Sequence, residues 1–260
     1  MKKFCILATQ RSGSTWILDS IQHSVHSRSV FGELFLDQPA RTKDPWREPQ
    51  GNLEPPVRYY DWRKASKVFP LTAPRLYLSF LELLYARKES YFGFKVMCNQ
   101  LLQKPWLAGI LKRDGYAVLH LKRNNLLDVY VSIQNQHKTK PHLRRDDPDR
   151  SKDYEAIRLE PPIVYRHITG MIRRENTAGL IMRFFGISME TVEYSRLAKG
   201  DNVEIEKLNR FIGRPVDLFS QQGLQKLSRK DTSQKIINYQ EVISYLSDKK
   251  LPQSYYLSPY

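Results

Sequence analysis

The chain has 260 residues, of which 41% are hydrophobic and 27% are charged. These proportions are typical of a globular protein that buries its own core, and they exclude a collagen, a coiled coil or a disordered chain. The 42 Lys and Arg residues outnumber the 27 Asp and Glu residues, and the resulting net charge of +15 favours a polyanionic partner such as nucleic acid, an anionic membrane or a phosphate-bearing ligand.

The chain carries no sequence signal for secretion or for a membrane span. The longest apolar run near the N-terminus, Phe4 to Ala8, is too short for either. The two cysteines, Cys5 and Cys98, have no C-x-x-C partner and allow at most one disulfide. We therefore expect a cytoplasmic protein.

The first 26 residues predict a strand, a tight turn and a helix. Residues 3–9 form an apolar run without alternation, which indicates a strand buried on both faces of a parallel sheet. Polar residues 10–13 interrupt the run, and apolar side chains then recur at helical spacing from residue 14 to about residue 26. This order of elements is the opening of an α/β unit.

The rest of the chain continues the same pattern. Prolines and aromatic residues dominate 36–75 and charged residues dominate 138–162, so both segments are predicted to be elaborated loops that act as lids on the acceptor side. The periodicity predicts helices over 75–88, 126–137, 164–185, 205–212 and 233–246, and strands over 91–97, 116–122 and 189–194. The prediction is a single α/β domain over 1–260, P-loop-like and three-layered, with a central parallel sheet flanked by helices.

The turn after the first strand has the features of a phosphate-binding loop. Its sequence is T-Q-R-S-G-S-T-W, and it lies directly before a helix, whose N-terminal amides attract anions. Gly13 can turn the backbone over a ligand, hydroxyl side chains add donors, and Arg11 adds a cation. A Walker A loop would need a second glycine and a Gly-Lys pair, so this loop does not fit a triphosphate with magnesium.

The segment R-S-G-S-T-W after a hydrophobic strand resembles the 5′-phosphosulfate loop of sulfotransferases that use 3′-phosphoadenosine 5′-phosphosulfate (PAPS). The resemblance implies that Arg11 lies against the bridging oxygen of the donor, which becomes negative as the S–O bond breaks. It also implies that the 5′-phosphate is bound by Ser12, Gly13, Ser14, Thr15 and Trp16.

A second fingerprint of the same family is an Arg that ends a strand, followed nine residues later by a Ser on a helix. Arg123 and Ser132 have this spacing. An Arg at the carboxyl end of a strand points to the edge where α/β sheets bind ligands, and its guanidinium can bind a phosphate in a fork. The resemblance assigns this pair to the 3′-phosphate, and it adds Arg229, in a loop before the last helix, as a further contact.

Within the family, the bacterial trehalose-sulfotransferase-like and carbohydrate (lipopolysaccharide) sulfotransferases are the most similar branch. The matching segments are 9–15, 33–35, 93–100, the pair Arg123 and Ser132, and 192–194. The branch implies that Glu33 is the catalytic base. Lys95, on the predicted strand 91–97, is expected to reach the transferred sulfate or the acceptor, although it could also be an ordinary surface residue of that strand. Glu33 could instead only neutralise Arg28.

The expected reaction is in-line transfer of a sulfuryl group from PAPS to a hydroxyl of a small-molecule or glycan acceptor, with adenosine 3′,5′-bisphosphate as the product. No metal ligand cluster is recognisable, so no metal is expected, and a homodimer remains open. A basic nucleic-acid-binding protein is the main alternative, although no nucleic-acid-binding motif is present. A nucleotide kinase, which would need ATP and magnesium, is a weaker one.

Overall fold

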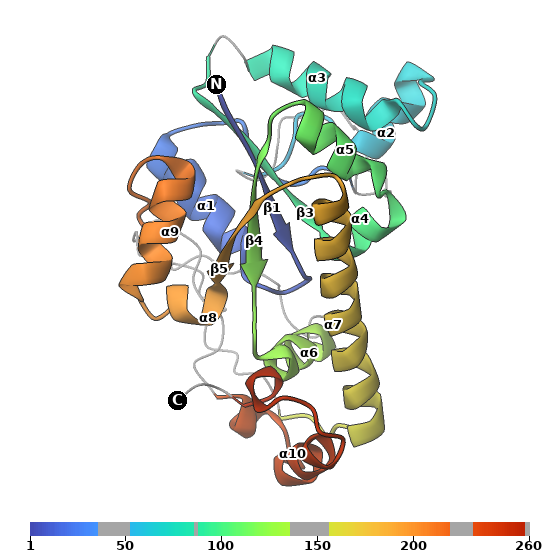
Figure 1. The fold of residues 1–260 in the computed structure, drawn as a ribbon, viewed down its shortest axis with the longest axis vertical. Helices are drawn as coiled ribbons and strands as arrows, with labels where there is room; N and C mark the ends of the chain where they lie inside the picture. Colours follow the sequence, from blue (N-terminus) through green and yellow to red (C-terminus); the bar gives the residue numbers. More distant parts are fainter. Residues whose placement is uncertain (36–52, 86–87, 136–155, 219–230, 258–260) are drawn as a thin grey trace.

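The computed structural model describes residues 1–35, 53–85, 88–135, 156–218 and 231–257. Five strands form one sheet in the order β2-β3-β1-β4-β5, and every neighbouring pair is parallel (Figure 1). The strands are β1 (Lys2–Ala8), β2 (Val30–Glu33), β3 (Tyr91–Met97), β4 (Ala117–Lys122) and β5 (Met189–Glu193). The predicted α/β fold with a central parallel sheet is confirmed.

Helices cover both faces of the sheet and form three layers with it. One face packs against α1 (Ser14–Val25) and α9 (Asn202–Ile212). The other packs against α2 (Tyr59–Ser66), α3 (Ala73–Tyr85), α4 (Cys98–Gln103), α5 (Trp106–Arg113) and the C-terminal half of α7 (Pro161–Phe184). The N-terminal half of α7 forms a third apolar cluster with α6 (Leu126–Gln134) and α10 (Tyr239–Asp248) beyond the carboxyl ends of the strands.

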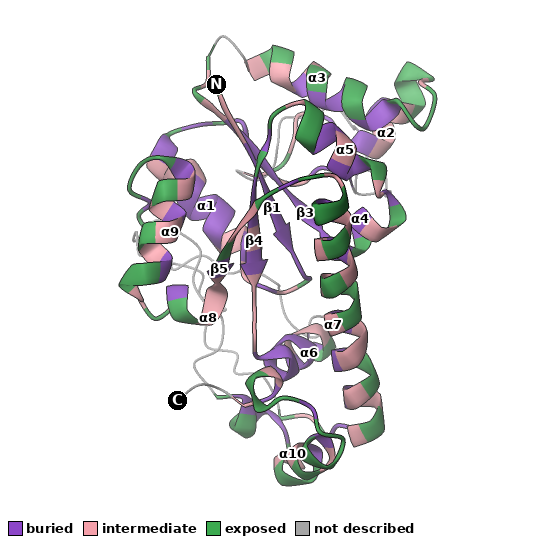
Figure 2. Cartoon of the chain, viewed as in Figure 1, coloured by how far each residue is buried: buried purple, intermediate pink, exposed green. Residues whose placement is uncertain are grey.

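The central position of β1 explains its unbroken apolar sequence. All five residues from Phe4 to Ala8 are fully buried (Figure 2). Successive side chains of a strand point to opposite faces, so Phe4 and Ile6 enter the core beneath α1, while Cys5 and Leu7 enter the core beneath the opposite helices. Both cysteines of the chain are buried and unpaired.

The strand order also locates the ligand-binding edge. The chain leaves β1 towards β2, on the far side of β3, and later adds β4 on the opposite side of β1. In open α/β sheets, ligands bind at the carboxyl ends of the strands where the order reverses in this way. The loop after β1 and the loop after β4 therefore meet at the expected binding edge.

The prediction of one long loop over 36–75 is wrong in its second half. Helix α2 and the start of α3 lie there. The prolines of the segment argued against a helix, but burial of Tyr59 and Trp62 in the core stabilises α2. Pro74 is the second residue of α3, where a missing N–H leaves no helical hydrogen bond unmade. Residues 36–52 lie outside the described ranges.

Several short elements were also missed by the sequence prediction. Strand β2 and helices α4, α5 and α8 (Tyr194–Leu197) have eight residues or fewer, which is too short for a clear hydrophobic period. The helix predicted over 233–246 is a short 3-10 helix, Thr232–Lys235, followed by α10. The second predicted loop ends before Pro161, which begins α7, and its residues 138–155 are not among those described. Among the described residues, no helix is both long and apolar enough to span a membrane.

Candidate functional site

The loop between β1 and α1 has a backbone shaped for a ligand. Arg11 and Gly13 both adopt the left-handed conformation, with φ of 61° and 84°. Such turns direct successive amide groups towards one point and commonly bind anions. The Oγ atom of Ser12 and the Oγ1 atom of Thr9 are buried, and neither has a hydrogen-bond partner within the described part of the chain. Buried hydroxyls are normally satisfied, so these atoms are suited to a bound ligand.

Gly13 is required here for space as well as for conformation. A Cβ atom built on Gly13 would lie 2.0 Å from a ring carbon of Tyr194, at the end of β5. The ring of Tyr194 therefore rests directly on the loop. No other amino acid fits without moving this ring.

We expect Gly13→Ala to destabilise the protein by about 1–3 kcal/mol more than Gly115→Ala does, as measured by urea unfolding. Gly115 is the matched control, because its φ of 74° carries the same backbone strain while nothing lies within 4 Å of the added Cβ. Equal losses of stability would contradict the close contact between Tyr194 and the loop.

Hydrogen bonds connect this loop to the end of β4 and to α6. The Nε of Arg11 donates to the Oγ of Ser132, at 3.0 Å, across 121 residues of sequence. The Nη1 of Arg123 donates to the backbone oxygen of Arg11, at 2.7 Å. The structure thus brings together the two segments that the sequence singled out separately, and their binding roles stay predictions.

Asp128 joins a third segment to the same cluster. Its carboxylate accepts hydrogen bonds from Arg123 Nη2, from Lys235 Nζ at 2.9 Å and from Thr232 Oγ1 at 3.2 Å. The side chain of Asn125, which caps α6, accepts from the amide of Asp128 at 2.9 Å. Sequence reasoning missed Lys235 and Thr232, whose only signal was their place just after the loop predicted to hold Arg229. Arg229, the residue expected there, lies outside the described ranges.

The charges of this cluster leave a positive excess. Among the described residues, Arg11, Arg123 and Lys235 supply three positive charges to the cluster and Asp128 supplies one negative charge, a difference of two. The side chains of Arg123, Asp128 and Lys235 are nearly buried, so solvent screens these charges weakly. A site of this kind attracts an anion with two negative charges.

The aromatic ring of Tyr194 also packs against the guanidinium of Arg123. The Cζ of Arg123 lies 4.9 Å from the centre of the Tyr194 ring, and the Trp16 ring meets that ring edge-on at 5.9 Å. Burial raises the pKa of Tyr194, so its hydroxyl stays protonated near neutral pH. The ring thus lies between the Gly13 loop and the Arg123 side chain.

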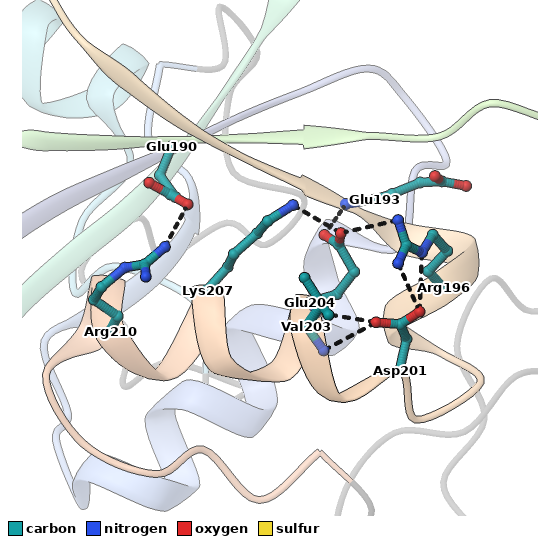
Figure 3. Close-up of polar contacts among 8 residues, drawn as sticks. All are labelled: Glu190, Glu193, Arg196, Asp201, Val203, Glu204, Lys207 and Arg210. Atoms are coloured by element: carbon teal, nitrogen blue, oxygen red, sulfur yellow. Dashed lines mark hydrogen bonds and ion pairs between the residues drawn. The ribbon is translucent and has the colours of Figure 1, made fainter.

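A polar network connects the end of β5 with α8 and α9 (Figure 3). The buried carboxylate of Glu204 accepts from the amide of Glu193, at 2.8 Å, and pairs with Lys207 at 2.8 Å. Asp201 accepts from the amides of Val203 and Glu204 at the start of α9, and Arg196 binds both Asp201 and Glu204. These contacts hold the end of β5 just before the tyrosine.

Glu33 and Lys95 lie next to each other, and Lys95 contacts the first turn of α1, directly after the loop. The Nζ of Lys95 donates to Thr15 Oγ1 at 3.0 Å and lies 3.4 Å from Glu33 Oε1. Gln100 donates to the second carboxylate oxygen of Glu33 at 3.3 Å. Burial lowers the pKa of Lys95, the Glu33 carboxylate opposes that shift, and the nearby charge of Arg11 adds to it. The candidate base is thus held by Lys95 and Gln100 beside the α1 N-terminus.

A partly buried histidine and carboxylate pair lies apart from these groups. His120 Nε2, on β4, is 3.3 Å from Glu175 Oε1, on α7, without hydrogen-bond geometry. Within the described ranges, no three His, Cys, Asp or Glu side chains form a group that could hold a metal ion.

No protein-family model matches the sequence, and no curated protein matches it. Among solved structures, the sulfotransferase domain from the curacin biosynthetic pathway is similar to this chain with a TM-score of 0.44 and 11% sequence identity. The alignment covers 100% of this chain and 93% of that one.

Proposed function

We propose that this protein is a sulfotransferase that moves the sulfuryl group of PAPS to a hydroxyl group of an acceptor. The observation that carries the proposal is that the β1–α1 loop and the end of β4, the two segments predicted to bind anions, meet at the reversal of strand order. Arg11 reaches Ser132 on α6, and Arg123 reaches back to the backbone of Arg11. A ligand with a phosphate at each end of an adenosine suits a pair of linked anion sites.

The α1 N-terminus is suited to the 5′-phosphate end of the donor. Its 12-residue helix offers unpaired amides and a partial positive charge. The unpartnered hydroxyls of Ser12 and Thr9 can donate to phosphate oxygens, and Gly13 keeps side-chain atoms away from them. Ser14, Thr15 and Trp16 complete the segment assigned to this end by resemblance.

The cluster around Asp128 is suited to the 3′-phosphate. A phosphate monoester carries about −1.5 to −2 charges at pH 7, which is opposite in sign to the positive excess of the described side chains in this cluster. Arg123 offers a planar fork and Ser132 a hydroxyl, and we add Lys235 and Thr232 to this site because both share the Asp128 carboxylate with Arg123. A 3′-phosphate distinguishes PAPS from other adenylates.

The proposed chemistry needs one proton acceptor and several fixed cations. Bound PAPS supplies the sulfuryl group, and adenosine 3′,5′-bisphosphate is released when the bond between sulfur and the 5′-phosphate oxygen breaks. Glu33 takes the proton of the acceptor hydroxyl as that oxygen bonds to sulfur. Lys95 and Arg11, which lie beside the α1 N-terminus, stabilise the charge that develops there. These cations offset the developing charge, so the proposed reaction needs no metal ion. We expect a carbohydrate or a small alcohol as the acceptor.

The direct test is incubation with PAPS and a panel of sugars, small alcohols and phenols, followed by mass spectrometry for an added sulfo group. Transfer to any hydroxyl supports the proposal. A protein that instead requires ATP and magnesium for transfer would be a kinase. One that transfers nothing and binds oligonucleotides with steep salt dependence would be a nucleic-acid-binding protein.

We also expect adenosine 3′,5′-bisphosphate to stabilise the protein against heat. At a concentration of about 100 times Kd, a ligand adds about 2.7 kcal/mol, which for a chain of this size raises Tm by roughly 5–10 °C. Adenosine 5′-phosphate at the same concentration is the matched control, because it lacks the 3′-phosphate. Equal shifts with the two nucleotides would contradict the assignment of the Asp128 cluster.

A further inference from the structure

The segment from residue 64 to residue 76, which we call the α2–α3 corner, exposes apolar side chains beside cations. Phe69 is 67% exposed, Leu71 58% and Leu76 45%. Lys64, Lys67 and Arg75 are exposed in the same segment, and the sequence contains no Asp or Glu from residue 62 to residue 81. Large apolar side chains grouped in this way on a surface commonly mark an interaction site.

The exposed tip of the corner has an ordered backbone. The carbonyl oxygen of Phe69 accepts hydrogen bonds from the amides of Thr72 and Ala73 and from the hydroxyl of Thr72, at 3.0–3.1 Å. The side chains of Phe69 and Leu71 are therefore held outward by a defined turn.

The base beneath this turn is rigid as well. Trp62 and Tyr77 are buried with their rings 5.4 Å apart, and the Tyr77 hydroxyl donates to Val57 O at 2.6 Å. Buried side chains thus support the turn that carries Phe69 and Leu71. The α2–α3 corner therefore does not need to become ordered before it binds a partner.

We infer that the α2–α3 corner docks onto an anionic membrane surface. Phe and Leu side chains enter the boundary between headgroups and acyl chains, while Lys and Arg beside them are attracted to anionic lipids. The cores of protein–protein interfaces are depleted of Lys, so a protein partner is favoured less by this composition. Proteins contact a nucleic-acid backbone with cations and polar groups, so such a partner would leave the exposed side chains of Phe69 and Leu71 without a contact.

The corner is remote from the proposed nucleotide site. Figure 1 shows α2 and α3 at the end of the molecule opposite α10, whereas the anion-binding loops lie at the carboxyl ends of the strands. Docking would hold the protein at a membrane without covering that site. The inference is independent of the proposed reaction.

The test is cosedimentation with phosphatidylcholine vesicles that contain or lack phosphatidylserine. We expect the wild-type protein to bind the phosphatidylserine vesicles more strongly, and less so as salt is added. Phe69→Ser with Leu71→Ser, and separately Lys64→Glu with Arg75→Glu, should each lower the bound fraction at least about fivefold. The measurement needs no nucleotide, so its result does not depend on sulfotransferase activity.

The matched controls change exposed residues at the other end of the molecule. Ile237→Ser removes an apolar side chain that is 64% exposed, and Lys249→Glu with Lys250→Glu reverses two exposed charges near the end of α10. These variants should bind like the wild type, and thermal melting should show that all variants are folded. Absence of vesicle binding, or binding lost only in the controls, would overturn the inference. Concentration-dependent self-association that the Phe69 and Leu71 changes abolish would also overturn it, since the corner would then contact a second copy.

Discussion

Arg123→Ala is expected to weaken the binding of adenosine 3′,5′-bisphosphate by at least about thirtyfold, as measured by isothermal titration calorimetry. The side chain is nearly buried between the Tyr194 ring and the Asp128 carboxylate, and it also donates to the backbone of Arg11. Its loss removes the planar fork for the phosphate and one of the two cations that the described residues place on Asp128, the other being Lys235. Removal of one partner of a buried charge pair typically costs about 3–5 kcal/mol of stability, so the variant should also melt earlier.

Two further variants test whether the weaker nucleotide binding is specific to the guanidinium of Arg123. Arg210→Ala is the matched control, because Arg210 is an exposed arginine with one carboxylate partner, Glu190, and should leave binding unchanged. Arg123→Lys keeps the charge without the fork or the stacking, so it should fall between wild type and alanine. Undiminished nucleotide binding by folded Arg123→Ala would remove this residue from the 3′-phosphate site.

Glu33→Gln is expected to lower turnover with PAPS by about 10²–10⁴-fold while nucleotide binding is retained. Glutamine has nearly the same shape, and its one carbonyl oxygen can keep the contact with Lys95 or the one with Gln100, but it cannot accept the proton of the acceptor hydroxyl. The measurement is the initial rate of sulfo transfer at saturating PAPS, together with the affinity for adenosine 3′,5′-bisphosphate.

A second carboxylate variant tests whether the lower turnover comes from loss of the base or from loss of any negative charge. Glu190→Gln changes a partly exposed glutamate that pairs with Arg210 on the surface, and its rate should match the wild type. A near-wild-type rate for Glu33→Gln would exclude Glu33 as the base. Lys95, whose pKa burial lowers, would then be the next group to test.

Much of the fold could be predicted because its signals are local. The apolar runs of β1, β3 and β4 are long enough to distinguish a buried strand, and Gly13 and Asn125 mark the starts of α1 and α6. The elements that were missed are short or contain prolines, and burial of a few side chains, such as Tyr59 and Trp62 in α2, outweighs their weak propensity.

The sequence by itself determined the parallel α/β fold and singled out the Arg11 loop and the pair of Arg123 and Ser132, because residue type and spacing carry that information along the chain. Only the tertiary structure decided which residues surround them. Lys235 reaches Asp128 across 107 residues, and Tyr194 rests on Gly13, since the order of the strands brings these distant segments to one edge. Contacts between such segments depend on three-dimensional packing, which no local pattern encodes.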